Sequence, residues 1–279
     1  MYNTLITIKK RTVFMIIDFH THAFPDKIAA RAVDSLKVKI NREPETDGTV
    51  MGLTDNMKNS GITLSVICNI ATNPRQTENV NTFAINTNEQ YKNIISLGSV
   101  HPDSKKVESE LLRIKNAGIP GIKIHPDYME HDIDEEVFYE TFELCSKLGL
   151  FVITHAGFDV CSPDHIHATP DMILRVIKRH PELKLVCAHF GANCMWDEVR
   201  EKLCGKNLWI DTSLAYVEKY DKDLLCDILL SHDPDKILYG SDCPWCPPGE
   251  NVKFIESFGL SDSLNEKIFE TNAKYLLKI

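Results

Sequence analysis

The sequence predicts a single-domain α/β protein with the (β/α)8, or TIM barrel, fold. Three observations predict it: eight short apolar runs, amphipathic segments between most of them, and a length of 279 residues. Strands that alternate with helices form parallel sheets, and a barrel of eight such units takes about 250 residues. We therefore expect residues 13–279 to form one barrel and residues 1–12 to form an extension before it, with Met15 as an alternative start.

The eight apolar runs have the length and the β-branched content of buried strands. They are residues 13–19, 62–70, 94–100, 121–124, 150–154, 184–188, 208–211 and 236–239. Helical patterns lie between them, at 107–116, 134–148, 170–180, 219–231 and 261–277. The segments 38–50 and 157–169 are longer than simple connections. Both follow the carboxyl end of a strand, where barrels of this fold build their active sites.

Composition limits the classes of partner. The hydrophobic content of 43% and the charged content of 25% are ordinary for a globular protein. A net charge of −9 disfavours nucleic acid and anionic membranes, which both attract basic surfaces. Nine cysteines, an odd number, without a signal peptide favour reduced thiols. We expect a cytoplasmic protein that acts on a small molecule, with neither nucleic acid nor membrane as a partner.

Two histidines end the first predicted strand, in the motif Asp18-Phe19-His20-Thr21-His22. Because side chains alternate along a strand, His20 and His22 are expected on the same face, where both can hold one cation. Neutral imidazole is a common ligand of zinc and similar metals. The motif therefore predicts a metal site.

Other predicted strands also stop at a polar residue. These are His101, His125, His155, His189 and Asp242. In a barrel the carboxyl ends of the strands surround one cavity. Three imidazoles and one carboxylate suit zinc with a water in an open position.

Two tempting motifs have weaker support. His165 and His167 repeat the spacing of the first pair, but they lie in a segment rich in proline and aspartate with no strand beneath it. Cys243 and Cys246 have redox spacing, but two prolines follow at once, where thioredoxin-like chemistry needs a helix. We expect Trp245, between these cysteines, to form apolar wall of the substrate pocket.

Taken together, the motifs resemble those of the amidohydrolase superfamily. The similarity is greatest to the amidohydrolase-related branch that includes aminocarboxymuconate semialdehyde decarboxylase and the resorcylate decarboxylases. It spans residues 16–277 and rests on five motifs, which are Asp18-Phe19-His20-Thr21-His22, Gly121-Ile122-Lys123-Ile124-His125-Pro126, Ile153-Thr154-His155, Cys187-Ala188-His189-Phe190-Gly191 and Tyr239-Gly240-Ser241-Asp242-Cys243-Pro244-Trp245.

The resemblance implies a role for each matching position. His20, His22 and His155 match the ligands of the metal. Asp242 matches an aspartate that contacts the metal and takes a proton from its water. His189 matches a histidine that polarises the substrate in members with one metal ion.

The fourth strand leaves the number of metal ions open. Binuclear relatives carry a carboxylated lysine on this strand, and Lys123 stands there. The pattern Lys123-Ile124-His125-Pro126 is more typical of relatives with one ion. We therefore expect one divalent ion, with zinc favoured over manganese. Lys123, His125 and Trp245 are then expected to contact substrate.

Three functions follow from this interpretation. The first is a metal-dependent hydrolase of an amide, lactone or ester bond in a small organic substrate. The second is a metal-dependent, non-oxidative decarboxylase of a small carboxylic acid with the same ligands. The third is a barrel that only binds partners, which the intact ligand set disfavours. Relatives in this family are often dimers, so a homodimer is an open expectation.

Overall fold

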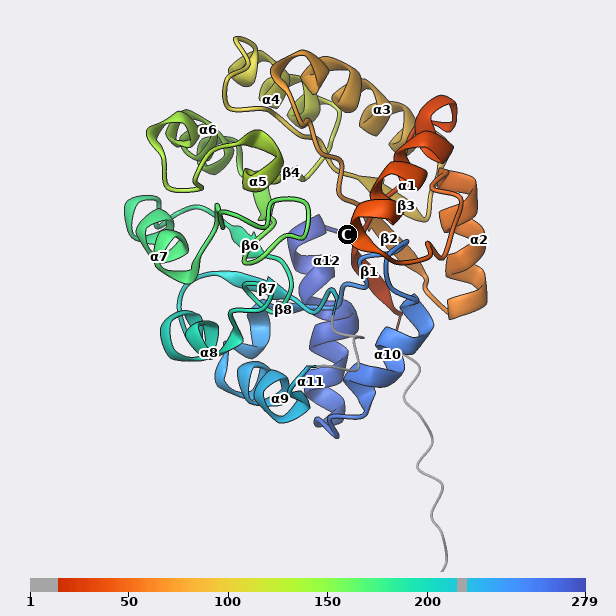
Figure 1. Ribbon diagram of the computed structural model, residues 1–279, viewed down its shortest axis with the longest axis vertical. Helices are drawn as coiled ribbons and strands as arrows, with labels where there is room; N and C mark the ends of the chain where they lie inside the picture. The colour runs from red at the N-terminus through yellow and green to blue at the C-terminus, as the bar shows by residue number, and fades with distance from the viewer. Residues whose placement is uncertain (1–14, 215–219) are drawn as a thin grey trace, which may run out of the picture.

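Eight parallel strands form the centre of the computed structural model, which describes residues 15–214 and 220–279 (Figure 1). Every predicted strand is present. They are β1 (Ile17–Thr21), β2 (Leu64–Ile67), β3 (Ile94–Ser96), β4 (Gly121–Ile124), β5 (Phe151–Thr154), β6 (Leu185–Cys187), β7 (Trp209–Asp211) and β8 (Ile237–Leu238). The predicted extension at residues 1–12 lies outside the described residues.

Backbone hydrogen bonds close the strands into a ring. Parallel pairing orders them as β1-β2-β3 and as β4-β5-β6-β7-β8. A bridge between Gly98 and Ile122 joins the two sheets on one side. On the other side, Phe19 donates its N–H to the carbonyl of Tyr239 at 2.8 Å. This ring of eight parallel strands confirms the (β/α)8 barrel.

Helices surround the ring. The α-helices are α1 (Asp26–Ile40), α2 (Val50–Ser60), α3 (Thr77–Gln90), α4 (Val107–Asn116), α5 (Pro126–Met129), α6 (Tyr139–Leu148), α7 (Pro170–Arg179), α8 (Trp196–Glu198), α9 (Lys222–Ser231), α10 (Pro248–Glu256), α11 (Asp262–Glu266) and α12 (Asn272–Leu277). Short 3-10 turns cover Pro74–Gln76, Glu136–Phe138 and Pro234–Lys236, and π-helical turns cover Val199–Leu203 and Lys267–Thr271. Among the described residues, no helix is both long and apolar enough to cross a membrane.

The predicted helices are present with adjusted ends. Residues 107–116 match α4, and 170–180 match α7 to within one residue. The pattern at 134–148 begins as a 3-10 turn and becomes helical only at Tyr139. The pattern at 261–277 is α11, a π-helical turn and α12 in succession. The first residue of the pattern at 219–231 lies outside the described residues, and α9 begins at Lys222.

The helix α1 occupies part of what the sequence suggested was a long loop. The expected loop at 38–50 is shortened to 41–49, because α1 extends to Ile40. Since α2 leads directly into β2, α1 is an additional helix inserted after β1. It lies inside the ring of outer helices in Figure 1.

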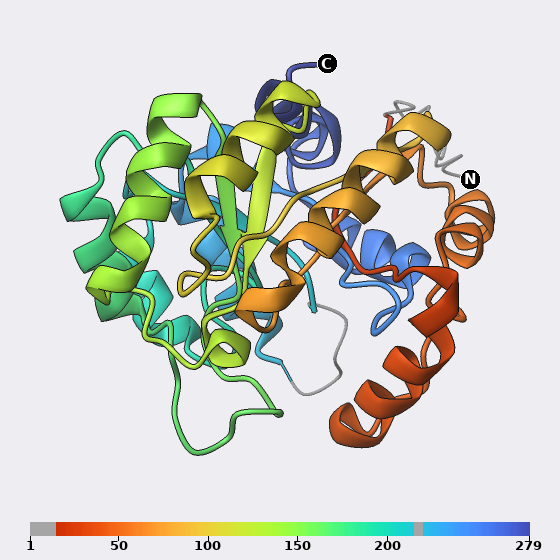
Figure 2. The ribbon, with the colours of Figure 1, turned by 90° about the horizontal axis from the view of Figure 1, so that it is seen from above.

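The barrel interior is apolar at one end and polar at the other. Side chains of Phe19, Phe151, Ile153 and Val186 pack with Leu276 of α12 in one buried cluster. Figure 2 shows α12 and α1 at opposite ends of the barrel. The polar strand ends therefore face the α1 side, where a pocket can open.

Candidate metal-binding active site

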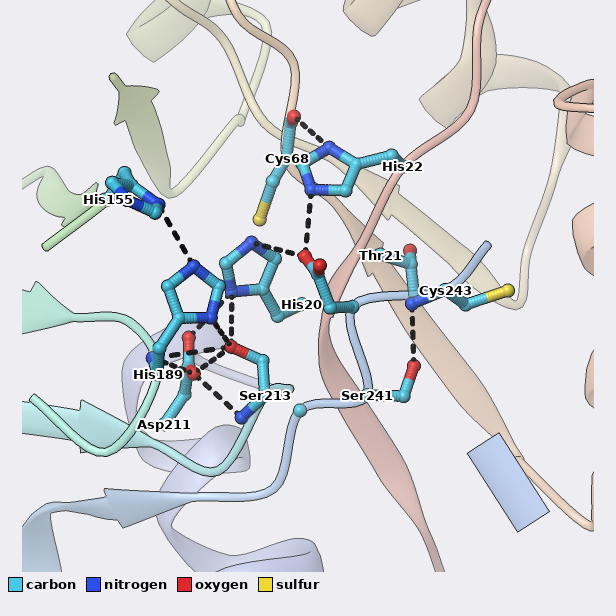
Figure 3. A network of polar contacts seen from close by, with 12 residues as sticks. His20, Thr21, His22, Cys68, His155, His189, Asp211, Ser213, Ser241 and Cys243 are labelled. Carbon is cyan, nitrogen blue, oxygen red and sulfur yellow. Dashed lines mark hydrogen bonds and ion pairs between the residues drawn. The ribbon is translucent and has the colours of Figure 1, made fainter. Parts of the chain in front are cut away.

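His20, His22 and Asp242, hereafter the β1–β8 group, converge at the seam where the first and last strands meet. The Nε2 atom of His22 lies 3.1 Å from Oδ1 of Asp242, and that of His20 lies 3.4 Å from the same oxygen. The two imidazole rings are 5.2 Å apart. The three side chains can therefore share one cation, and Figure 3 shows His20 and His22 of this group.

A bulge in β1 brings the two histidines together. The pairing of β1 with β2 shifts register between Asp18 and Thr21. Phe19 packs in the apolar barrel interior, yet its neighbour His20 lines the pocket together with His22. The expected shared face is therefore reached through an irregularity that re-aims a side chain, and not through strict alternation.

Contacts behind the rings determine which nitrogens face the pocket. His22 Nδ1 lies 3.1 Å from the carbonyl oxygen of Cys68. His20 Nδ1 lies 2.8 Å from Oδ2 of Asp211. A carbonyl or carboxylate oxygen only accepts, so each Nδ1 donates to its outer partner and each Nε2 is directed at Asp242. Two imidazole nitrogens and the Asp242 carboxylate thus face one another, an arrangement that fits a metal ion.

Lys123 is almost completely buried beside this group, with 1% of its surface exposed. Its Nζ lies 3.1 Å from Nε2 of His20 and donates to it. Lys123 therefore lies against the β1–β8 group, on the strand where binuclear relatives carry their bridging lysine.

His189 and His155 form a pair next to the β1–β8 group. The Nε2 of His189 lies 3.0 Å from Nδ1 of His155, and its Nδ1 lies 2.8 Å from Oγ of Ser213. Ser213 Oγ donates in turn to Asp211. Figure 3 shows that one carboxylate, Asp211, thereby supports both His20 and His189.

Asp211 and Ser213 were not among the residues that the sequence singled out. Asp211 is completely buried, and its Oδ1 accepts hydrogen bonds from the backbone N–H groups of His189 and Ser213. Its oxygens are occupied by protein donors, so it serves as an anchor for the rings. The apolar run at 208–211 stops at an aspartate, which is the signal that could have identified it.

Burial controls the charge of the histidines. Removal from water lowers the pKa of His20, His125, His155 and His189 well below the usual value for histidine. These imidazoles are therefore neutral near pH 7, the form that binds a metal.

His125, Asp127 and His155, hereafter the β4–β5 group, are a second cluster in the same pocket region. Their ligand atoms lie close together, with His125 Nδ1 at 3.6 Å and His155 Nε2 at 4.0 Å from Oδ2 of Asp127. These three atoms are buried and have no hydrogen-bond partner among the described residues. The two rings stack 4.2 Å apart at 7°. Because lone pairs lie in the ring planes, parallel rings cannot both point at one ion.

The backbone is strained at two of the site residues. His189, the following Phe190, and Asp242 have φ values of 60°, 57° and 71°, in the left-handed region. Non-glycine residues in such conformations cost free energy and cluster at functional sites.

The pocket above these residues has a volume of about 630 Å³. Its walls include every residue that the sequence singled out for metal, substrate or catalysis, which are His20, His22, Lys123, His125, His155, His189, Asp242 and Trp245. The Nδ1 of His155 faces His189, the neighbour of the β1–β8 group. The segment 157–169 contributes Phe158, Asp159 and Val160 to the wall.

The two motifs with weaker support lie in different settings. His165 and His167 group with Asp132 in a third cluster, but His165 is exposed and pairs with Asp132 at 2.7 Å. Cys243 and Cys246 are buried free thiols. Burial raises the pKa of Cys246 to about 12 and that of Cys243 well above its ordinary value, so neither forms a reactive thiolate at neutral pH.

The fold and the site define a TIM barrel with a histidine- and aspartate-lined pocket. The family model of the amidohydrolases (Amidohydro_2) matches residues 17–279. The chain therefore belongs to the amidohydrolase family. Among curated proteins, none matches the sequence significantly.

Solved structures of three proteins share the fold at low sequence identity. An uncharacterised TIM-barrel protein from Bordetella bronchiseptica aligns at a TM-score of 0.73 and 18% identity, over 94% of this chain and 98% of that one. A manganese complex of 5-carboxyvanillate decarboxylase from Novosphingobium aromaticivorans aligns at 0.70 and 15%, over 95% and 96%. A candidate 2-pyrone-4,6-dicarboxylic acid hydrolase from Pseudomonas putida aligns at 0.66 and 17%, over 96% and 98%. The same fold thus occurs in a decarboxylase and in a protein described as a candidate hydrolase.

Proposed function

We propose that this protein is a metal-dependent hydrolase that cleaves an amide, lactone or ester bond in a small organic substrate. The observation that carries the proposal is the β1–β8 group, in which the Nε2 atoms of two imidazoles lie within 3.4 Å of one carboxylate oxygen. The carboxylate of Asp211 and the carbonyl of Cys68 accept from the Nδ1 atoms and so keep both Nε2 atoms directed at Asp242. That donor set fits one divalent ion, with zinc favoured over manganese.

We assign the ligands from this geometry and from the family resemblance. His20 and His22 hold the ion through Nε2, and Asp242 contributes its carboxylate. His155 is proposed as the remaining ligand through Nδ1, the atom that now contacts His189. A divalent ion held by these residues would lower the pKa of a bound water toward neutrality.

The remaining steps belong to side chains of the pocket. Asp242 accepts the proton of the attacking water, since its carboxylate lies at the centre of the group and is only 6% exposed. We assign to His189 the polarisation of the scissile carbonyl. Ser213 accepts from its Nδ1, so this role requires a proton on its Nε2 as well. Lys123 and His125 contact the polar end of the substrate, and Trp245 contributes apolar wall.

A decarboxylase with the same ligands is the second candidate. The similarity to 5-carboxyvanillate decarboxylase favours it. The charge of the pocket favours hydrolysis of a neutral bond, because Arg42 and Lys123 are the cationic side chains among the described residues that line it, whereas Asp159 and Asp242 also line it. Arg42 already donates to the carbonyl of Trp245 at 2.9 Å.

The test combines metal analysis with two product assays. We expect one equivalent of zinc or manganese per chain by mass spectrometry, and release of acid from an ester, lactone or amide panel without carbon dioxide. The variant Asp242→Asn is expected to lose activity by about 10²–10⁴-fold, the usual contribution of a general base. Carbon dioxide release from hydroxybenzoates without hydrolysis would make the protein a decarboxylase. Turnover within a few-fold of wild type in Asp242→Asn would contradict the assigned proton transfer.

A further inference from the structure

One face of α1 forms an apolar wall of the pocket. Ile28, Ala32, Leu36 and Ile40 recur every fourth residue, and all four line the cavity. Residues four apart lie on the same side of a helix. At 1.5 Å per residue, this stripe is about 18 Å long, which is far more than the metal ligands occupy.

The helix is held so that this stripe faces the cavity. Ala29 and Val33, on the adjacent side, are buried against the body of the protein. The opposite side faces solvent, where Val38 is 80% exposed and does not line the cavity. The stripe is therefore directed inward by the packing of α1.

The walls that face the stripe are also apolar. Val80 and Phe83 of α3, Phe158 and Val160 of the segment 157–169, and Leu214 all line the same cavity. Val160 and Ile28 remain 46% and 43% exposed. These exposed apolar side chains border the same pocket as the β1–β8 group, so one ligand can contact both.

Charge in this part of the cavity is low. Of the two cationic side chains that line it in residues 15–214 and 220–279, Lys123 is buried against His20. Arg42 donates through one Nη1 to the carbonyl of Trp245 and to Sγ of Cys246. Among the described residues, the stripe itself carries no cationic side chain, so an anionic group buried against it would be unpaired, which is costly.

We infer that the slot between α1 and these walls binds the uncharged apolar part of the substrate, a medium-chain acyl group or an aryl group. This inference rests on the proposed function, since it names the class of substrate that the hydrolytic centre acts on. Each methylene buried in the slot is expected to raise kcat/KM about fourfold.

The first experiment measures kcat/KM of the metal-loaded enzyme for 4-nitrophenyl acetate, butyrate, hexanoate and octanoate. We expect a rise along the series. The variant Leu36→Asp places a charge in the slot and is expected to lower the value for octanoate at least tenfold, with little change for acetate. Val38→Asp introduces the same charge on the solvent side of the same helix and is the matched control. A flat series, or equal losses in both variants, would overturn the inference.

A binding measurement tests the slot independently of catalysis. The neutral fluorophore N-phenyl-1-naphthylamine reports apolar binding without turnover. We expect it to bind wild type and Val38→Asp alike and Leu36→Asp at least tenfold more weakly. This pattern without ester hydrolysis would uphold the slot and reject the hydrolase. Ester hydrolysis with equal fluorophore binding by all three proteins would reject the slot alone. Leu36→Ala removes the same side chain without adding a charge, so it controls for misfolding caused by the charge in Leu36→Asp.

Discussion

The pocket carries two groups of histidine and aspartate that look alike in composition and differ in the partners of their ring nitrogens. In the β1–β8 group, Asp211 and the carbonyl of Cys68 each accept from an Nδ1, so both Nε2 atoms are directed at Asp242. In the β4–β5 group, the rings of His125 and His155 stack in parallel. Their facing atoms have no hydrogen-bond partner among the described residues.

The difference shows that residue type alone does not make a metal site. Outer partners fix the tautomer and the ring plane, and these decide whether lone pairs meet at one point. The β4–β5 group also faces Asp159, whose Oδ2 lies 3.5 Å from Nε2 of His125. We therefore assign the ion to the β1–β8 group and the substrate's polar end to His125.

We expect the largest effect from a substitution that disrupts the β1–β8 group and leaves the β4–β5 group intact. His22→Ala removes a proposed ligand, so we expect bound metal to fall from one equivalent to near zero. His125→Ala removes a ring of the β4–β5 group, and metal content is expected to stay at one equivalent. Mass spectrometry of the purified proteins measures both. Loss of metal in His125→Ala with retention in His22→Ala would reverse the assignment.

We expect a smaller effect from substituting the carboxylates that lie behind the histidine rings. Asp211→Asn weakens the hydrogen bond to His20 Nδ1, and we expect metal affinity to fall about 10–100-fold. Asp127→Asn changes the corresponding carboxylate behind His155, which is 4.0 Å away, and is expected to change affinity much less. Competition against a chromogenic chelator measures both constants. Equal losses would mean that both groups support the ion.

The smallest effect concerns stability and pH. Burial, and secondarily the nearby Asp159, raise the pKa of Asp127 above its ordinary value. The folded protein thus binds this proton more tightly than the unfolded chain does. This contribution to stability is complete below the ordinary pKa and is lost as the pH rises through the raised one.

Asp127→Asn removes that titration. We expect the variant to gain stability relative to wild type as the pH increases from 4 to 8, measured as the difference between their urea unfolding midpoints. A difference that does not vary with pH would show that Asp127 is satisfied in the folded protein. Asp55→Asn, on the exposed face of α2, provides a control.

The sequence was sufficient to predict the barrel and the residues at its rim, because apolar runs that stop at His or Asp mark strand ends directly. It was not sufficient for the orientation of His155, since the direction of a ring depends on neighbours distant in sequence. The helix α1 was passed over although its apolar residues are spaced four apart, which is a helical pattern. Asp211 was passed over although its strand was identified.

The closing hydrogen bonds of the barrel have a consequence for how the protein is made. His22 and Asp242 are 220 residues apart in sequence, and they come from the first and last strands. The metal ion that we propose between them would join the first and last strands of the barrel. This junction is the last part of the ring to be completed during synthesis. The binding free energy of the ion then adds to the stability of the closed ring. Uptake of metal would thus report that a newly made chain has finished folding.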